Sequence, residues 1–310
     1  MNSMHGLIFA AKVLLFYQKS VPLRTFGANL NVCNMEIQLI DTGYFYADGG
    51  AMFGAIPKTA WGRRYPSDEH NGCILAMRTL FIKVGDRIVL IDTGAGDKHL
   101  QRLAYYRFFD MHCLRDILRD RGVAPEEVTD VVLTHLHFDH CAGCTYPSGS
   151  ILSVAFPRAA HWVSRRQWEN FRNAHPLEQA SFFREDMEAV EAAGLLHLID
   201  APTALCSEIE LRLADGHTPG QLVPYIHDAE ETLVFAGDVI PLLASVSPEW
   251  ISAYDLAPTL SYDAKLRILS EAAECHQRII FCHDAYALSS RVKQTASGLY
   301  VIERDSLIRR

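Results

Sequence analysis

The chain has 310 residues, with 29 Lys and Arg against 37 Asp and Glu, and its formal net charge is −8. Hydrophobic residues make up 49% and charged residues 21%, which is typical of a globular protein and excludes a disordered or fibrous chain. The acidic balance disfavours a nucleic-acid partner, because such binding depends on neutralising phosphates.

The N-terminal segment differs from the rest of the chain. Its longest apolar run, Leu7 to Tyr17, is interrupted by Lys12 and is shorter than the roughly 18 residues of a membrane span. It also lacks the basic leader and cleavage site of a secretory signal, so we expect a cytoplasmic protein without a membrane partner. Met35 begins an alternating segment that predicts an edge strand. We therefore interpret 1–34 as an extension before a natural start; the alternative is an arm that packs on a partner or membrane.

The first half of the remaining chain alternates between predicted strands and helices. Residues 49–54 (GGAMFG) are small and predict a flexible loop. Two β-rich runs, 73–84 and 87–92, are separated by a Gly-Asp turn and predict a hairpin. Helical spacing of apolar residues predicts a helix from 100 to 121, which includes His112, and 131–134 is a short buried strand.

The second half continues in the same way. We expect helices at 165–173, 178–193 and about 263–275, and strands near 208–213, 222–227, 232–236 and 279–282. Strands interleaved with helices predict a layered α/β domain. No repeat or linker interrupts residues 35–310, so we expect one domain there.

The segment Thr134-His-Leu-His-Phe-Asp-His140 carries the strongest chemical signal. It follows a predicted buried strand, and His135 and His137 alternate, so they point the same way in extended backbone. Asp139 and His140 follow where the chain should turn. Imidazole and carboxylate groups suit divalent transition metals, and one such cluster supplies about half of a two-metal site.

Three further segments place a histidine or aspartate in a turn or at the end of a strand. They are Gly216-His217-Thr-Pro-Gly220, Phe235-Ala-Gly-Asp238 and Ile280-Phe-Cys-His283. Strand ends are where α/β folds build their sites. Each segment alone is also compatible with a turn histidine, a capping aspartate or a buried core histidine.

Taken together, these residues resemble the metallo-β-lactamase superfamily over 35–310. The resemblance rests on His-x-His-x-Asp-His followed in order by His217, Asp238 and His283. It implies a four-layer αββα sandwich with the site at one edge of two sheets. It also implies that one metal ion binds His135, His137 and His217, that a second binds Asp139, His140 and His283, and that Asp238 bridges them. Asp92, at the end of an early strand, is expected to orient a ligand histidine.

Differences between this chain and other branches of the superfamily limit which activity we expect. Asp238 stands where the main zinc β-lactamases have cysteine, and His137 where flavodiiron proteins have a carboxylate. Too few residues separate Asp238 from His283 for a nuclease cap domain, and too few follow His283 for the helical domain of glyoxalase II. The segments 49–61, 236–241 and 250–258 resemble the branch of N-acyl-homoserine lactonases and methyl-parathion-hydrolase-like enzymes.

This branch implies a hydrolase that opens N-acyl-homoserine or related lactones by attack of a hydroxide bridging two divalent ions. Zinc is the first choice of metal, with manganese, iron or cobalt as alternatives. Asp139 and Asp238 are the expected catalytic residues, and Asp139 would shuttle a proton. Some lactonases have a tyrosine three positions after the bridging aspartate, where this chain has Pro241, and Tyr254 is a candidate replacement. An organophosphate or aryl ester hydrolase with the same site, or a non-enzymatic metal-stabilised binding protein, are the alternatives.

Several aromatic and sulfur-containing residues remain to be placed. Candidate walls of an acyl-chain pocket are Phe53, Trp61, Phe138 and Trp162, although core packing is the preferred interpretation for Trp162. A further hypothesis is a homodimer in which an exposed Met52-Phe53 loop closes the partner's pocket. Most of the eight cysteines are expected to be buried free thiols, including the Cys-x-x-Cys pair at 141 and 144, for which a redox function is disfavoured.

Overall fold

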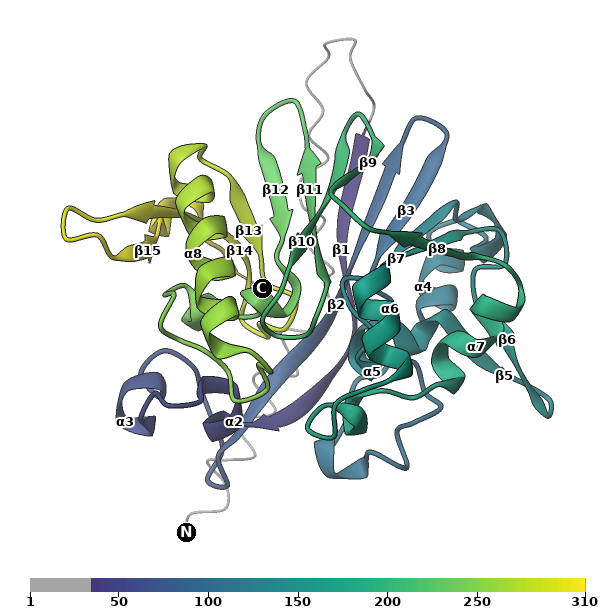
Figure 1. Cartoon of the computed structure of the whole chain (residues 1–310), viewed down its shortest axis with the longest axis horizontal. Coiled ribbons are helices and arrows are strands. Elements are labelled where there is room, and N and C mark those ends of the chain that lie inside the picture. Colours follow the sequence, from purple (N-terminus) through teal and green to yellow (C-terminus); the bar gives the residue numbers. More distant parts are fainter. Residues whose placement is uncertain (1–34, 310) are drawn as a thin grey trace.

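Two β-sheets form the centre of the structure, which is a computed structural model that describes residues 35–309 (Figure 1). The predicted extension 1–34 lies outside these residues. The first sheet has the order β1-β2-β3-β4-β7-β8. Its strands are β1 (Met35–Asp48), β2 (Gly72–Val84), β3 (Arg87–Ile91), β4 (Asp130–Val132), β7 (Ala160–Ser164) and β8 (Leu196–Ile199). The predicted edge strand at Met35 and the hairpin around Gly85 are confirmed.

The second sheet is built from the C-terminal part of the chain, in the order β15-β14-β13-β12-β11-β10-β9, with β16 paired to β14. Its strands are β9 (Thr203–Cys206), β10 (Ile209–Ala214), β11 (Gln221–His227), β12 (Thr232–Phe235), β13 (Arg278–Ile280), β14 (Ala287–Gln294), β15 (Tyr300–Ile302) and β16 (Ile308–Arg309). A separate hairpin pairs β5 (Thr145–Ser148) with β6 (Ile151–Val154). The strands predicted in this half are all present.

Helices lie on both outer faces of the paired sheets. The α-helices are α2 (Gly49–Phe53), α3 (Lys58–Trp61), α4 (Leu114–Asp120), α5 (Phe138–Cys141), α6 (Arg165–Arg172), α7 (Glu185–Ala192) and α8 (Pro258–Glu274). Short 3-10 turns are η1 (Ala104–Tyr106), η2 (Pro125–Glu127), η3 (Ala142–Cys144), η4 (Gln179–Ser181), η5 (Gly237–Val239), η6 (Leu243–Ser245) and η7 (Arg304–Ser306). Within residues 35–309, no helix combines the length and apolar character that crossing a membrane requires.

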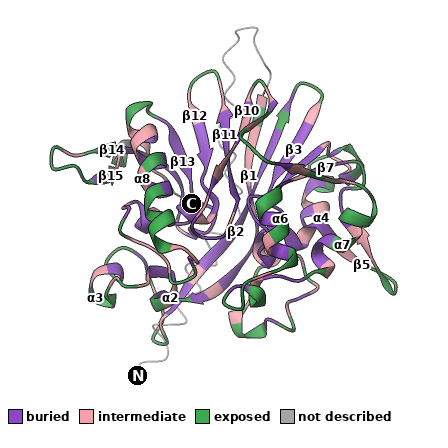
Figure 2. Cartoon of the chain, in the orientation of Figure 1, coloured by how far each residue is buried: buried purple, intermediate pink, exposed green. Residues whose placement is uncertain are grey.

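The strands of both sheets are largely buried (Figure 2), and the alternation of their residues between clusters explains how four layers pack. In β3, Leu90 faces a cluster shared with α4, α6 and α7, whereas Val89 and Ile91 face a cluster shared with the second sheet. In β12, Phe235 faces the first sheet, whereas Val234 packs with α8. Because successive strand residues point to opposite faces, each sheet is covered on both sides. The predicted αββα sandwich is therefore confirmed.

The segment 49–54 is a short helix, so the prediction of a flexible loop is wrong. The Asp48 side chain accepts a hydrogen bond from the backbone N–H of Ala51 at 3.0 Å and caps α2. Met52 and Phe53 are buried, and Phe53 stacks on Trp61 with ring centroids 4.9 Å apart. The exposed loop that suggested a homodimer does not exist.

Two predicted helices are shorter than expected. Between 100 and 121 only η1 and α4 are helical, because Arg107 and Asp110 adopt positive φ angles of 48° and 50°. His112 therefore lies before α4, where it is exposed and pairs with Asp110. The helix predicted at 178–193 begins at Glu185, since the residues before it turn toward the candidate site. Conversely, α8 starts at Pro258, earlier than predicted, with proline in the first turn.

Candidate metal centre

The sequence-predicted site residues gather where strands of both sheets end. Asp92 follows β3 and the histidine-rich segment follows β4, and these two strands are parallel. Asp238 follows β12 and His283 follows β13, which are also parallel. Carboxyl ends of parallel strands meet at one edge of a sheet, so local sequence and topology together place these groups at the same edge.

Backbone turns then aim the side chains. His137 is the N-cap residue of α5, and Asp139 and His140 lie in the helix itself. Gly216, which precedes His217, has φ +137°, and a Cβ there would lie 2.4 Å from the backbone nitrogen of Ser261. A side chain at this position would push the His217 turn away from α8, so the turn requires glycine.

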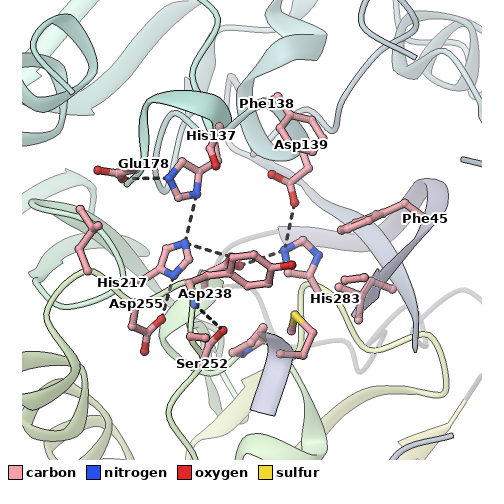
Figure 3. A pocket seen from close by; sticks show the side chains of 18 of the residues that line it. Phe45, His137, Phe138, Asp139, Glu178, His217, Asp238, Ser252, Asp255 and His283 are labelled. Carbon is pink, nitrogen blue, oxygen red and sulfur yellow. Dashed lines mark hydrogen bonds and ion pairs between the residues drawn. The ribbon is translucent and has the colours of Figure 1, made fainter. Parts of the chain in front are cut away.

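Three histidines form a first group. His137 Nδ1 lies 3.0 Å from His135 Nε2. It also lies 3.1 Å from His217 Nε2 (Figure 3). All three side chains are buried. Three imidazole nitrogens that face one another at this spacing match the donors of a divalent metal site.

A second group contains Asp139, His140 and His283. His140 Nε2 and His283 Nε2 are 3.1 Å apart, and Asp139 Oδ2 is 3.5 Å from His283 Nε2. Asp238 lies between the two groups. Its Oδ1 is 3.0 Å from His283 Nε2 and 3.3 Å from His140 Nε2, while its Oδ2 is 3.3 Å from His217 Nε2. The structure thus brings together all seven residues predicted as ligands, with one carboxylate facing both groups.

The opposite nitrogen of each imidazole has a hydrogen-bond acceptor. His140 Nδ1 is 2.8 Å from Asp92 Oδ2, as expected for Asp92, and His283 Nδ1 is 2.7 Å from the carbonyl of Ala76. His135 Nδ1 is 3.1 Å from Thr134 Oγ1, whose own proton is donated to Asp92. An outer N–H donated in this way leaves the inner nitrogen with a free lone pair. The donor set therefore fits two divalent cations.

Two acidic residues that the sequence analysis missed complete this arrangement. Glu178 Oε1 lies 2.9 Å from His137 Nε2, and Asp255 Oδ1 lies 3.0 Å from His217 Nδ1 (Figure 3). Both are buried, and Asn170 donates to the second oxygen of Glu178 at 2.8 Å. Both residues lie between helices and strands, at no regular spacing from the candidate ligands that could have identified them in the sequence. Asp255 lies in the segment 250–258 that resembles the lactonase branch, and this resemblance was the only sequence feature that pointed to it.

A buried arginine fixes the loop that carries His283. Arg78 of β2 pairs with Asp41 at 2.8 Å and donates to the carbonyls of Phe281 and Asp284. The Asp284 carboxylate accepts from the backbone N–H groups of Leu243, Tyr286 and Ala287. These contacts join the first sheet to the loop after β13, next to a candidate ligand.

The electrostatics of the site favour positive charge around Asp238. Burial lowers the pKa of His135 well below its usual value, with help from His140 and His137. Burial also opposes protonation of His140, but Asp238, Asp139 and Asp92 outweigh it and hold that pKa well above the usual value. For Asp238, burial is outweighed by His283, His140 and His217, so its pKa lies well below the usual value. A cation would meet a deprotonated carboxylate here.

A cavity of about 230 Å³ opens over the two groups. Its lining includes Asp139, Asp238 and His283 and the apolar side chains of Phe45, Met52, Leu75, Phe138, Leu177, Pro241 and Leu256. Of the four aromatic side chains predicted to line an acyl-chain pocket, only Phe138 lines this cavity. Phe53 and Trp61 stack beneath, in the core, and Trp162 lies on β7, where its indole donates to Asp130 at 2.9 Å. Tyr106 and Tyr254 also line the cavity, whereas no Lys or Arg among residues 35–309 does.

Comparison with known proteins supports the assignment of the fold. Residues 78–147, which include the histidine-rich segment, match the model of the metallo-β-lactamase superfamily. Over this segment the chain is similar to that superfamily.

Several solved structures align with 80–91% of the chain. A probable metal-dependent hydrolase from Staphylococcus aureus has a TM-score of 0.80 at 24% identity, covering 89% of this chain and 99% of the other. AidC, a dizinc quorum-quenching lactonase with a bound product, has a TM-score of 0.73 at 20% identity, covering 91% and 98%. An N-acyl homoserine lactone hydrolase, with its product bound at the catalytic metal centre, has a TM-score of 0.63 at 18% identity, covering 80% and 93%. At these identities the likeness concerns the fold.

Proposed function

We propose that this protein is a dinuclear metal-dependent hydrolase that opens N-acyl-homoserine or related lactones. The observation that carries the proposal is the pair of candidate ligand groups, joined by Asp238, at a cavity lined by both apolar and acidic side chains. Two similar folds are those of lactonases, one of them described as dizinc. Zinc is the metal we expect first, because imidazole and carboxylate donors suit it.

Each candidate ligand has a proposed place. His135, His137 and His217 would hold one cation; Asp139, His140 and His283 would hold the other, and Asp238 would contact both. Bound divalent cations lower the pKa of a water molecule and polarise a carbonyl oxygen, which is the chemistry that ester hydrolysis needs. No serine or cysteine nucleophile lines the cavity next to a general base in the described part of the chain.

The other residues of the cavity contribute protons and orientation. Asp139 faces the cavity with a carboxylate whose Oδ2 is directed to His283, and its second oxygen is available to carry a proton to the leaving alkoxide. Tyr254 lines the cavity, and because a phenol is protonated at neutral pH it can donate a hydrogen bond to an ester oxygen. We therefore propose that Tyr254 takes the role of the tyrosine that some lactonases have at the position of Pro241.

The charge of the cavity favours a neutral substrate. Glu178, Asp139, Asp238 and Asp255 line it, and it has no basic side chain with which to bind a substrate carboxylate. Neutral lactones meet this condition, as do neutral phosphotriesters and aryl esters, which remain the second candidate substrates. Anionic β-lactams and phosphodiesters do not meet it.

The test is a substrate panel with protein reconstituted with zinc or manganese. We expect turnover of N-acyl-homoserine and aliphatic lactones to exceed that of a paraoxon-type triester, and anionic esters to be poor substrates. Asp238→Asn is expected to abolish every activity. Faster triester hydrolysis would favour the second candidate, and a protein that takes up metal but hydrolyses none of these compounds would refute the proposal.

A further inference from the structure

Cys282 contacts the carboxylate that joins the two ligand groups. Its Sγ lies 3.3 Å from Asp238 Oδ1, within hydrogen-bond distance for a thiol. Cys282 directly precedes His283, and its ligand atom lies within 4.8 Å of those of Asp238 and His283. In the described part of the chain, no other hydrogen-bond donor besides the imidazoles reaches the Asp238 carboxylate.

The thiol approaches Asp238 from the core and not from the cavity. Cys282 is 1% exposed and packs in the cluster between the two sheets, with Phe235 and Ile280. It is absent from the lining of the cavity, which includes Asp238, His217 and His283. The carboxylate is therefore held between a sulfur on its inner side and the imidazole nitrogens at the site.

This position bears on how Asp238 can face two groups at once. Its Oδ1 lies close to the imidazole nitrogens of His140 and His283, and its Oδ2 lies close to that of His217. Rotation about the terminal bond of an aspartate side chain is broad and meets no sharp staggered minima. A donor fixed to Oδ1 restricts that rotation and keeps the two oxygens directed to different groups.

We propose that Cys282 is a positioning residue that donates its thiol proton to Asp238 Oδ1 and thereby holds the carboxylate in a bridging orientation. The inference rests on the proposed two-cation site but not on the identity of the substrate. Loss of this donor allows both carboxylate oxygens to turn toward one group. Binding of the second cation then weakens more than binding of the first.

The experiment compares Cys282→Ala, which removes the donor, with Cys282→Ser, which retains one as a hydroxyl. Metal-free wild-type and variant proteins are titrated with Zn²⁺ against a competing chromophoric chelator, and both stepwise dissociation constants are fitted. We expect Cys282→Ala to weaken the second constant by about tenfold, as is usual for partners of metal ligands, and to leave the first largely unchanged. Cys282→Ser should restore most of the loss. Cys73→Ala, which removes a buried thiol that packs in the cluster of Phe53 and Trp61 and belongs to neither ligand group, is the matched control and should bind as wild type.

Three outcomes overturn the proposal. The second constant of Cys282→Ala could equal that of wild type, or Cys282→Ser could bind as weakly as Cys282→Ala, which would indicate packing alone. A Co²⁺ titration gives the third: an intense sulfur-to-cobalt absorption band in wild type that Cys282→Ser lacks would show that the thiolate is a ligand and not a donor to Asp238. Wild type that binds fewer than two cations would refute the two-cation site and this inference together, whereas two tight cations without lactone turnover would refute only the substrate.

Discussion

Replacing Asp92 by asparagine tests whether the outer hydrogen bonds prepare the site for metal. Asp92 Oδ1 accepts from the backbone N–H of Thr134 at 2.7 Å, and Oδ2 accepts from His140 Nδ1 at 2.8 Å. Asparagine has one acceptor oxygen and one NH₂ donor. If the oxygen stays on Thr134, the NH₂ faces His140 Nδ1, and the ring must move its proton to Nε2, the nitrogen that faces the proposed cation. If the amide flips, its NH₂ faces the Thr134 N–H.

Either arrangement leaves a buried donor without an acceptor or blocks a metal ligand. An unsatisfied buried donor costs about 1–3 kcal/mol. Applied to cation binding, that corresponds to a loss of roughly 5- to 150-fold in affinity. We therefore expect Asp92→Asn to bind the cation at His140 at least about fivefold more weakly than wild type, and to lose activity at limiting metal.

The assay is competitive Zn²⁺ titration of metal-free protein, with metal content after desalting as a second measure. Asp130→Asn is the matched control, because Asp130 is a buried carboxylate on the same sheet that accepts from Arg87 and Trp162 and touches no candidate ligand. The control should lose stability but keep wild-type affinity for both cations. Asp92→Asn with two tightly bound cations would refute the reasoning.

Three further predictions concern single side chains. Burial lowers the pKa of Lys265 from 10.5 to about 8. Between these two pH values the unfolded state therefore binds more protons than the folded state. The free energy of unfolding should then rise with pH, by up to about 3 kcal/mol. Lys265→Met should lack this rise when urea unfolding is compared at pH 7.5 and 10, and an unchanged slope would contradict the prediction. Glu178→Gln should weaken the cation at His137 by about tenfold in Zn²⁺ titrations, because an amide is a poorer acceptor for the imidazole N–H; unaltered affinity would argue against it. Tyr254→Phe should lower kcat for lactones by about tenfold or more with metal content unchanged, and a normal kcat would exclude the phenol from catalysis.

The layered fold and the convergence of the seven candidate ligands could be predicted because their signals are local or ordered along the chain. Strand runs such as 87–92 carry their own alternation, and the His-x-His-x-Asp-His segment lies within one turn after β4. His217, Asp238 and His283 are individually ambiguous, and only their order with respect to that segment identified them. The structure brings them together because the parallel strands end at the same edge.

The errors arose where contacts distant in sequence decide the conformation. Helical spacing at 100–121 gave no indication that Phe109 would form a β-bridge to Tyr44, which interrupts any helix there. Glu178 reaches His137 from a segment that its own composition assigned to a helix. Phe53 and Trp61 pack on each other beneath the cavity, and hydrophobicity alone does not separate a pocket wall from the core behind it.

The two candidate ligand groups draw on both sheets, so metal bound there would be coupled to the integrity of the whole sandwich. His135 and His137 come from the first sheet and His217 from the second, and the other group likewise combines Asp139 and His140 with His283. A cation bound at either place would cross-link the N-terminal and C-terminal halves of the chain without a covalent bond. Such a ligand stabilises the folded state in proportion to the logarithm of its concentration over its dissociation constant. Metal supply would thus control how long the protein persists as well as how fast it works.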